Sequence, residues 1–131
     1  MAEMVEFELV SPTALLMSEA VEMVEVPGGD GDIGVLPGHS LLISTLRPGV
    51  IKVHEGGKVR ENIFVEGGFC EVSPERCTVL AEEAKMVGDL DKAAADERLA
   101  KAREALSGAE DKDAAEAEIK IAEAMVEAAK G

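Results

Sequence analysis

The most glycine-rich stretch of the chain is also the one that most resembles a ligand-binding motif. Residues 29–34 read Gly-Asp-Gly-Asp-Ile-Gly and match the G-x-G-x-x-G pattern of dinucleotide-binding loops. Such a loop binds pyrophosphate only where a helix begins directly after it, because the helix N-terminus supplies the backbone N–H groups. Here Pro37 and Gly38 follow, which disfavour a helix, and Asp30 and Asp32 would repel a phosphate. The stretch therefore predicts no nucleotide site.

The same two aspartates are spaced like the first ligands of a calcium-binding loop. The twelfth position of that loop is Leu41, where calcium coordination needs a glutamate. We therefore expect an irregular loop between sheets, whose glycines take positive φ angles. Its length also favours a second interpretation, a loop that contacts a partner protein.

The other side chains that could do chemistry are few and dispersed. The two histidines, His39 and His54, belong to no Ser-His-Asp, Cys-His or H-E-x-x-H arrangement. Cys70 and Cys77 flank a predicted turn at 73–76, which would make them diagonal neighbours at roughly 7 Å, too far for an easy disulfide. Two cysteines alone do not form a structural zinc site. We expect two buried small hydrophobes here, and no catalytic residue, cofactor or metal.

Composition and charge narrow the class of partner. The chain of 131 residues has 27 acidic and 13 basic side chains and a net charge of −14. This charge would repel nucleic acid and anionic lipid, and the chain has no Trp or Tyr on which bases could stack. A basic protein surface is the natural complement. No apolar run is long enough to span a membrane and no targeting peptide is visible, so we expect a cytoplasmic location.

The elements that must position these residues fall into two parts, and residues 1–88 read as β-structure. Residues 4–10 alternate apolar and acidic side chains, and 21–26 do so more loosely. The Glu55–Lys58 turn predicts a hairpin within 50–65. Strand-sized runs separated by turns at roughly 8–12-residue intervals are typical of a sandwich or flattened barrel.

Residues 89–131 contain no proline and predict two antiparallel helices of about 17–20 residues each. The predicted apolar seams consist of Ala95, Leu99, Ala102 and Leu106 in the first helix and Ala114, Ala117, Ile121, Ala124 and Ala128 in the second. We expect Asp89 or Asp91 to cap the first helix and Gly108 to end it in a left-handed conformation. The acidic residues at 110–113 should stabilise the start of the second helix.

These seams are mostly alanine, which buries little apolar area, so an isolated hairpin would be only marginally stable. Two interpretations stay open. Either the hairpin docks elsewhere and can detach, or it is permanently packed.

The motif residues resemble a known family. Residues 24–39 read Val-Glu-Val-Pro-Gly-Gly-Asp-Gly-Asp-Ile-Gly-Val-Leu-Pro-Gly-His, and they are followed by Leu46-Arg-Pro-Gly-Val-Ile51, by Gly-Gly-Phe-x-Glu-Val at 67–72 and by Asp-Leu-Asp at 89–91. Together they resemble the epsilon subunit of F-type ATP synthase over the whole chain apart from a short C-terminal stretch. The resemblance implies an α+β fold with a ten-stranded β-sandwich or flattened barrel, followed by an antiparallel helical hairpin.

The resemblance also implies a function without catalysis. Such a subunit lies in the central stalk, binds the gamma subunit, touches the ring of c subunits and helps to couple proton flow to ATP synthesis. Gly31 and Asp32 would face the c-ring, and His39 would lie near gamma. In many members the hairpin moves and restrains ATP hydrolysis, which would bring it to the alpha and beta subunits. The expected location is peripheral, on the cytoplasmic face of a bacterial inner membrane, with membrane association only through the complex.

One departure concerns ATP. Family members that bind it carry an I/L-D-x-x-R-A motif, and the matching residues here are Leu90, Asp91, Ala94 and Ala95. Ala94 stands where the motif has its arginine, so a phosphate would lack its bidentate partner, and we expect weak or no ATP binding. The alternative to a stalk subunit is a non-catalytic adaptor that presents a helical hairpin to another protein.

Overall fold

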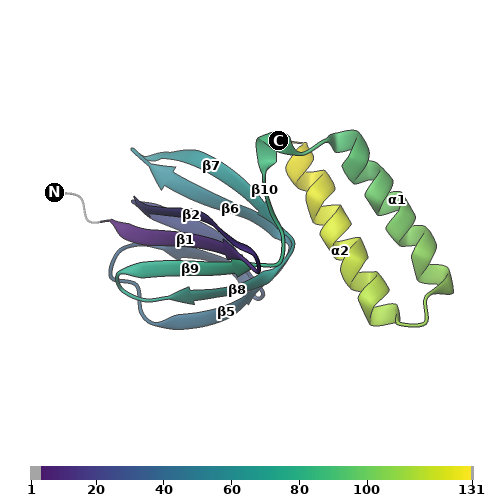
Figure 1. The fold of residues 1–131 in the computed structure, drawn as a ribbon, viewed down its shortest axis with the longest axis horizontal. Coiled ribbons are helices and arrows are strands. Elements are labelled where there is room, and N and C mark those ends of the chain that lie inside the picture. Colours follow the sequence, from purple (N-terminus) through teal and green to yellow (C-terminus); the bar gives the residue numbers. More distant parts are fainter. Residues whose placement is uncertain (1–3, 131) are drawn as a thin grey trace.

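The computed structural model describes residues 4–130, which form a curled β-sheet followed by two helices (Figure 1). The ten strands are β1 (Val5–Ser11), β2 (Ala14–Val21), β3 (Met23–Gly28), β4 (Gly31–Val35), β5 (Leu42–Leu46), β6 (Gly49–Glu55), β7 (Lys58–Val65), β8 (Gly68–Val72), β9 (Arg76–Ala81) and β10 (Ala84–Met86). The 3₁₀ turn η1 (Val87–Asp89) leads into α1 (Lys92–Gly108) and α2 (Lys112–Ala129). The predicted α+β fold with ten strands and a helical hairpin is confirmed.

The strands pair in the order β10-β7-β6-β3-β5-β8-β9-β1-β2, and β4 pairs with β3 beside this path. Neighbouring strands run antiparallel except for β1 and β9, which are parallel. The sheet curls until its two ends approach each other, so that one concave side faces inward (Figure 1). This curl gives the flattened barrel that the strand pattern predicted.

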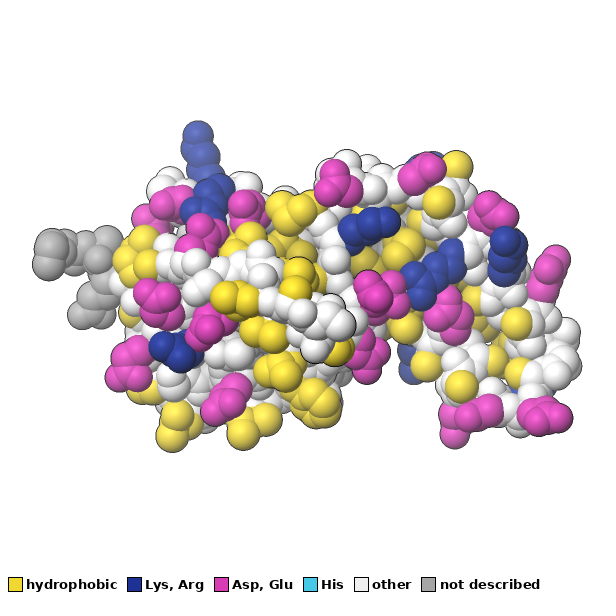
Figure 2. Space-filling view, in the orientation of Figure 1, with side chains coloured by type: hydrophobic (Ala, Val, Ile, Leu, Met, Phe, Trp, Pro, Cys, Tyr) yellow, Lys and Arg dark blue, Asp and Glu magenta, His cyan; other side chains and the backbone are white. Residues whose placement is uncertain are grey.

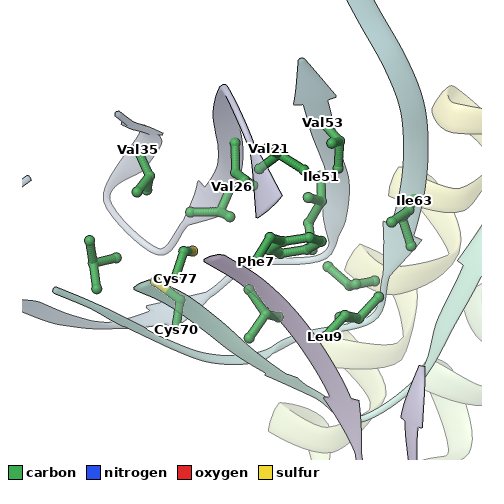
Figure 3. Close-up of a cluster of buried hydrophobic side chains, with 14 of the residues drawn as sticks. Phe7, Leu9, Val21, Val26, Val35, Ile51, Val53, Ile63, Cys70 and Cys77 are labelled. Atoms are coloured by element: carbon green, nitrogen blue, oxygen red, sulfur yellow. The ribbon is translucent and has the colours of Figure 1, made fainter. Parts of the chain in front are cut away.

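Alternate side chains of the strands point into one apolar core. In β1, Val5, Phe7 and Leu9 are at most 2% exposed, whereas Glu6 between them faces solvent. Figure 3 shows that side chains from several strands meet there, among them Phe7, Leu9, Val21, Val26, Val35, Ile51, Val53 and Ile63. Burial of a side chain of this size stabilises the fold by roughly 1.5–3 kcal/mol. The alternation predicted at the N-terminus is therefore confirmed.

Two predicted turns are confirmed as well. Gly56 and Gly57 take φ angles of 63° and 75°, as a two-residue hairpin turn between β6 and β7 requires. The 73–76 turn joins β8 to β9, and it leaves Cys70 and Cys77 buried and free on adjacent strands. Burial raises the pKa of the Cys77 thiol to about 12.

The region around the glycine-rich stretch is more regular than predicted. The expected strand over 21–26 is wrong in its bounds, because the chain bends at Glu22 between β2 and β3. The expected irregular loop is also wrong, since β4 forms a ladder with β3 that pairs Val24 with Val35 and Gly28 with Gly31. The ladder satisfies backbone groups that an irregular loop would leave to water.

Both helices begin at an aspartate. The carboxylate of Asp91 accepts from the Ala93 N–H at 3.0 Å, and that of Asp111 accepts from the Ala114 N–H at 3.0 Å. Of the two predicted caps for α1, Asp91 is the right one, because Asp89 lies in η1. Each cap satisfies an N–H group that has no partner within its helix.

The predicted left-handed end of α1 is wrong. Gly108 is the last helical residue and has no positive φ, and Ala109 continues in an extended conformation with a φ of −74°. The Lys112 ammonium donates to the Leu106 carbonyl at 2.6 Å. A cation there satisfies the last carbonyls and favours the negative helix end, so a left-handed residue is not needed.

The seam of α1 is confirmed, since Ala95 and Ala102 are buried. The predicted seam of α2 is wrong in its first part, because Ala114 and Ala117 are exposed. Its later members, Ile121, Ala124 and Ala128, are partly buried, and the fully buried alanine is Ala122. α2 packs against both α1 and the sheet, so it needs two apolar stripes. The spacing of its alanines does not show which stripe faces α1 and which faces the sheet.

Candidate functional site

Gly31 and Asp32 lie at the tip where β3 turns into β4. A side chain on Gly28 would place its Cβ 2.5 Å from the Gly31 carbonyl oxygen, so the turn has room only for glycine there. Gly31 itself has a φ of 146°, which residues with side chains rarely adopt. The glycines thus shape a tight turn that projects Asp32 to solvent, with 66% of its side chain exposed.

Asp32 has a partner that the sequence did not indicate. The Arg47 guanidinium forms an ion pair with the Asp32 carboxylate, and its other terminal nitrogen donates to the Gly28 carbonyl at 2.7 Å. Arg47 follows β5, so this contact ties the tip of the β3–β4 hairpin to the β5–β6 turn. Both side chains remain largely exposed, which leaves the pair accessible to a partner's charges.

His39 lies at the other end of the β half. It precedes β5, and the neighbouring Gly38 N–H donates to the Pro74 carbonyl at 2.8 Å in the β8–β9 turn. The far end of β5 is Leu46, which pairs with Gly28 beside the glycine tip. The structure therefore does not bring Asp32 and His39 together but separates them by the length of β5.

The outer side of the sheet between these ends is apolar. Directly opposed residues share one face of a sheet. Phe69 is paired with Leu80, Leu80 with Val10, and Val10 with Leu15. Ile43 points to the same side from β5, two residues before Thr45, the partner of Phe69. We call these five residues, Val10, Leu15, Ile43, Phe69 and Leu80, the apolar outer face.

This apolar outer face is exposed. Leu15 is 59%, Ile43 74%, Phe69 56% and Leu80 52% exposed. Figure 2 shows hydrophobic side chains gathered over β9, β8 and β5, with acidic side chains around them. Single exposed apolar residues are ordinary, but a contiguous group with a polar rim is typical of a protein-binding surface. A signal was present in the sequence, because Val79-Leu80-Ala81 in β9 lacks the alternation of a strand with one solvated face.

A charged cluster joins the hairpin to the β half. Arg98 on α1 donates to both carboxylate oxygens of Glu66, at 2.9 and 3.1 Å, in the connection between β7 and β8. The same guanidinium donates to both oxygens of Glu118 on α2, at 2.6 and 3.2 Å. These hydrogen bonds, those of Glu66 first, raise the pKa of Arg98 above its usual value. We call Glu66, Arg98 and Glu118 the junction cluster.

The degenerate ATP motif lies beside this cluster. Asp91 caps α1, Ala94 is exposed and Ala95 is buried against α2, while Leu90 precedes the cap. A groove of about 440 Å³ runs between the helices past Ala94, and Arg98, the arginine lining it, is held by two carboxylates. The arrangement offers a phosphate no free arginine among the groove residues.

Neither a metal-binding cluster nor a membrane-spanning helix is found in residues 4–130. No group of three or more His, Cys, Asp or Glu side chains within them is arranged to hold a metal ion. Neither described helix is long and apolar enough to cross a membrane. The candidate surfaces are therefore the glycine tip with Asp32, the opposite end of β5 with His39, the apolar outer face between them, and the docked hairpin.

The sequence and fold have clear relatives. The family described as "ATP synthase, Delta/Epsilon chain, beta-sandwich domain" matches residues 4–87. The ATP synthase epsilon chain of Rhodospirillum rubrum is 56% identical over 100% of both chains, and that of Paramagnetospirillum magneticum is 53% identical over 98% of each.

Solved structures agree. A chain in the Euglena gracilis mitochondrial ATP synthase, resolved with OSCP, F1 and the c-ring, superposes with a TM-score of 0.81 at 27% identity, covering 98% of this chain and 82% of that one. A chain of the Tetrahymena thermophila mitochondrial ATP synthase central stalk and c-ring shares the fold at a TM-score of 0.56 and 13% identity, covering 66% of this chain and 69% of that one. The chain therefore belongs to the family of ATP synthase epsilon chains.

Proposed function

We propose that this chain is a non-catalytic epsilon subunit in the central stalk of a proton-translocating ATP synthase, where it helps to couple proton flow through the c-ring to ATP synthesis. The observation that carries this proposal is the apolar outer face between two exposed tips. With this arrangement, the β half has a separate contact surface for each of two partners.

The apolar outer face is the proposed contact for the gamma subunit. Its residues lie on five adjacent strands, so they form a continuous surface held by the sheet rather than by loops. His39 stands at the end of β5 that leads into this face, which supports a role for it at the rim of the same contact. A buried apolar centre with polar residues around it is the usual anatomy of a stable interface.

The glycine tip is the proposed contact for the c-ring. Gly31 lets the chain turn tightly, and Asp32 presents a carboxylate whose Arg47 partner is itself 44% exposed. A basic residue on the rim of the ring could share or replace Arg47 at this carboxylate. Such an exposed pair contributes little to folding, about 0–1 kcal/mol, so it is free to serve recognition.

The remaining parts of the proposal follow from this placement. The β half, residues 1–88, would carry both stalk contacts, and the hairpin, residues 89–131, would be the regulatory part that meets the alpha and beta subunits. The subunit would be peripheral on the cytoplasmic face of a bacterial inner membrane and attached only through the complex, without nucleic acid. With Ala94 in place of an arginine it would bind ATP weakly or not at all, and low-micromolar affinity in calorimetry would contradict this.

A reconstitution experiment tests the proposal. Epsilon-depleted ATP synthase is supplied with the full chain or with a version that ends at Gly88, and proton-coupled ATP synthesis and ATP hydrolysis are measured. Both versions should restore coupling, because both carry the apolar outer face and the tip. If neither version restores coupling, the stalk assignment is wrong and the result favours the adaptor interpretation. Equal hydrolysis with the two versions would show that the hairpin does not restrain this enzyme.

A further inference from the structure

We propose that the junction cluster is an ionic latch, in which Arg98 holds the hairpin on the β half and its separation from Glu66 releases the two helices together. The inference concerns the isolated chain, so it does not depend on the proposed role in ATP synthase. Figure 2 shows basic and acidic side chains meeting where the β half joins the helices.

The geometry is that of a strong ion pair. Arg98 uses four hydrogen bonds to satisfy both oxygens of two carboxylates, all between 2.6 and 3.2 Å. The side chains of Glu66 and Arg98 are 19% and 30% exposed, so the pair is partly withdrawn from water. Bidentate pairs in such surroundings contribute more than pairs on an open surface.

The apolar contacts under the hairpin are limited. Phe64 on β7 is 1% exposed although Ile63 and Val65 on either side point into the sheet core, so Phe64 points outward and is covered by the hairpin. Met125 of α2 and Arg98 line the same hollow of about 160 Å³ beside it. A larger hollow of about 560 Å³ separates Ala124 and Ala128 from β6. Packing under the hairpin is therefore incomplete, and small alanines offer little dispersion attraction.

Charge explains why one arginine matters. Glu66 and Glu118 both face the Arg98 guanidinium, one from the β half and one from the hairpin. With Arg98 present, its positive charge lies between the two carboxylates and offsets their mutual repulsion. Without it, two like charges would face each other across the junction and push the hairpin away. The two ion pairs of Arg98 hold different parts together. The pair with Glu66 joins the hairpin to the β half, and the pair with Glu118 joins α1 to α2.

Hydrogen exchange with mass spectrometry on the full chain tests the latch through Glu66→Gln, which keeps the shape and removes the charge. We expect amide exchange in residues 92–129 to accelerate about 5- to 30-fold. This range lies between the loss of stability expected for an exposed ion pair and that expected for a buried one. Exchange in β1, β8 and β9 should stay unchanged. Glu123→Gln is the matched control, because it removes an exposed pair between Arg103 and Glu123 at 3.9 Å and should change exchange less than 2-fold.

A second readout separates release from unfolding. Phe64→Trp introduces the only tryptophan of the chain, at the surface that the hairpin covers. Adding Glu66→Gln to this variant should shift the emission to longer wavelength as the indole meets water, while β-sheet circular dichroism is retained. The latch is refuted if Glu66→Gln exchanges like Glu123→Gln. It is also refuted if strands β1, β8 and β9 accelerate together with the helices, because the pair would then hold the whole fold.

Discussion

Truncation of Phe69 to alanine should weaken binding to the gamma subunit without unfolding the chain. Phe69 lies in the middle of the apolar outer face, with Leu80 opposite it on β9 and Thr45 opposite it on β5. Its ring is 56% exposed, so more than half of its surface does not stabilise the free chain. Loss of the ring should therefore cost folding only about 1 kcal/mol.

The exposed surface sets the size of the binding effect. A phenylalanine presents about 200 Å², of which 56% or about 110 Å² is left for a partner to cover. At about 25 cal/mol per Å², covering that area contributes about 2.8 kcal/mol, which corresponds to roughly a 100-fold change in Kd. The alanine variant retains its Cβ and backbone contacts, so we expect a rise in Kd of about 30- to 100-fold.

Binding of the purified chain to purified gamma subunit, measured by calorimetry, gives this Kd directly. The matched control is Val59→Ala, an apolar truncation at a residue that is 42% exposed on β7, away from the apolar outer face. Its Kd should stay within 2-fold of the unchanged chain. If Phe69→Ala and Val59→Ala bind gamma equally well, the apolar outer face is not the gamma contact and the reasoning from exposed area is wrong.

Asp32→Lys should loosen association with the c-ring in a co-sedimentation assay, yet leave the melting temperature within a few degrees because the pair with Arg47 is exposed. Gly68→Ala should destabilise the chain by about 3 kcal/mol in urea, since its Cβ would lie 2.0 Å from the Leu80 carbonyl oxygen, whereas Gly88→Ala has open space and should be neutral. Burial raises the pKa of the Cys77 thiol from 9.0 to about 12, so between these pH values the folded state keeps a proton that the unfolded state has lost. The free energy of unfolding should therefore fall as the pH rises from 9 toward 12. Cys77→Ala should flatten this pH dependence.

The parts of the fold set by neighbouring residues were predictable. The alternation in β1, the Gly56-Gly57 turn and the register of Cys70 and Cys77 each depend on a few consecutive residues, and all were confirmed. The strand β4 was missed because its two glycines and its aspartate have low strand propensity, and the ladder with β3 overrides that propensity.

The contacts of the candidate surfaces depend on residues far apart in the chain. Arg47 meets Asp32, and Arg98 meets Glu66, only because the sheet and the hairpin bring these segments together. No spacing rule for a single helix or strand connects such residues. The apolar run in β9 indicates part of the apolar outer face, but not its extent, because its members come from five strands and each strand contributes only one residue.

The parallel pairing of β1 with β9 has a consequence for synthesis. β1 is made first and can form its antiparallel ladder with β2 at once, but its other edge stays open until residues 76–81 have left the ribosome. A contact between such distant segments closes slowly, because the entropy of the long intervening chain must be lost first. The nascent chain therefore carries a β1–β2 hairpin with one open strand edge and an uncovered apolar side through much of its synthesis, and this is the interval in which a chaperone would protect it.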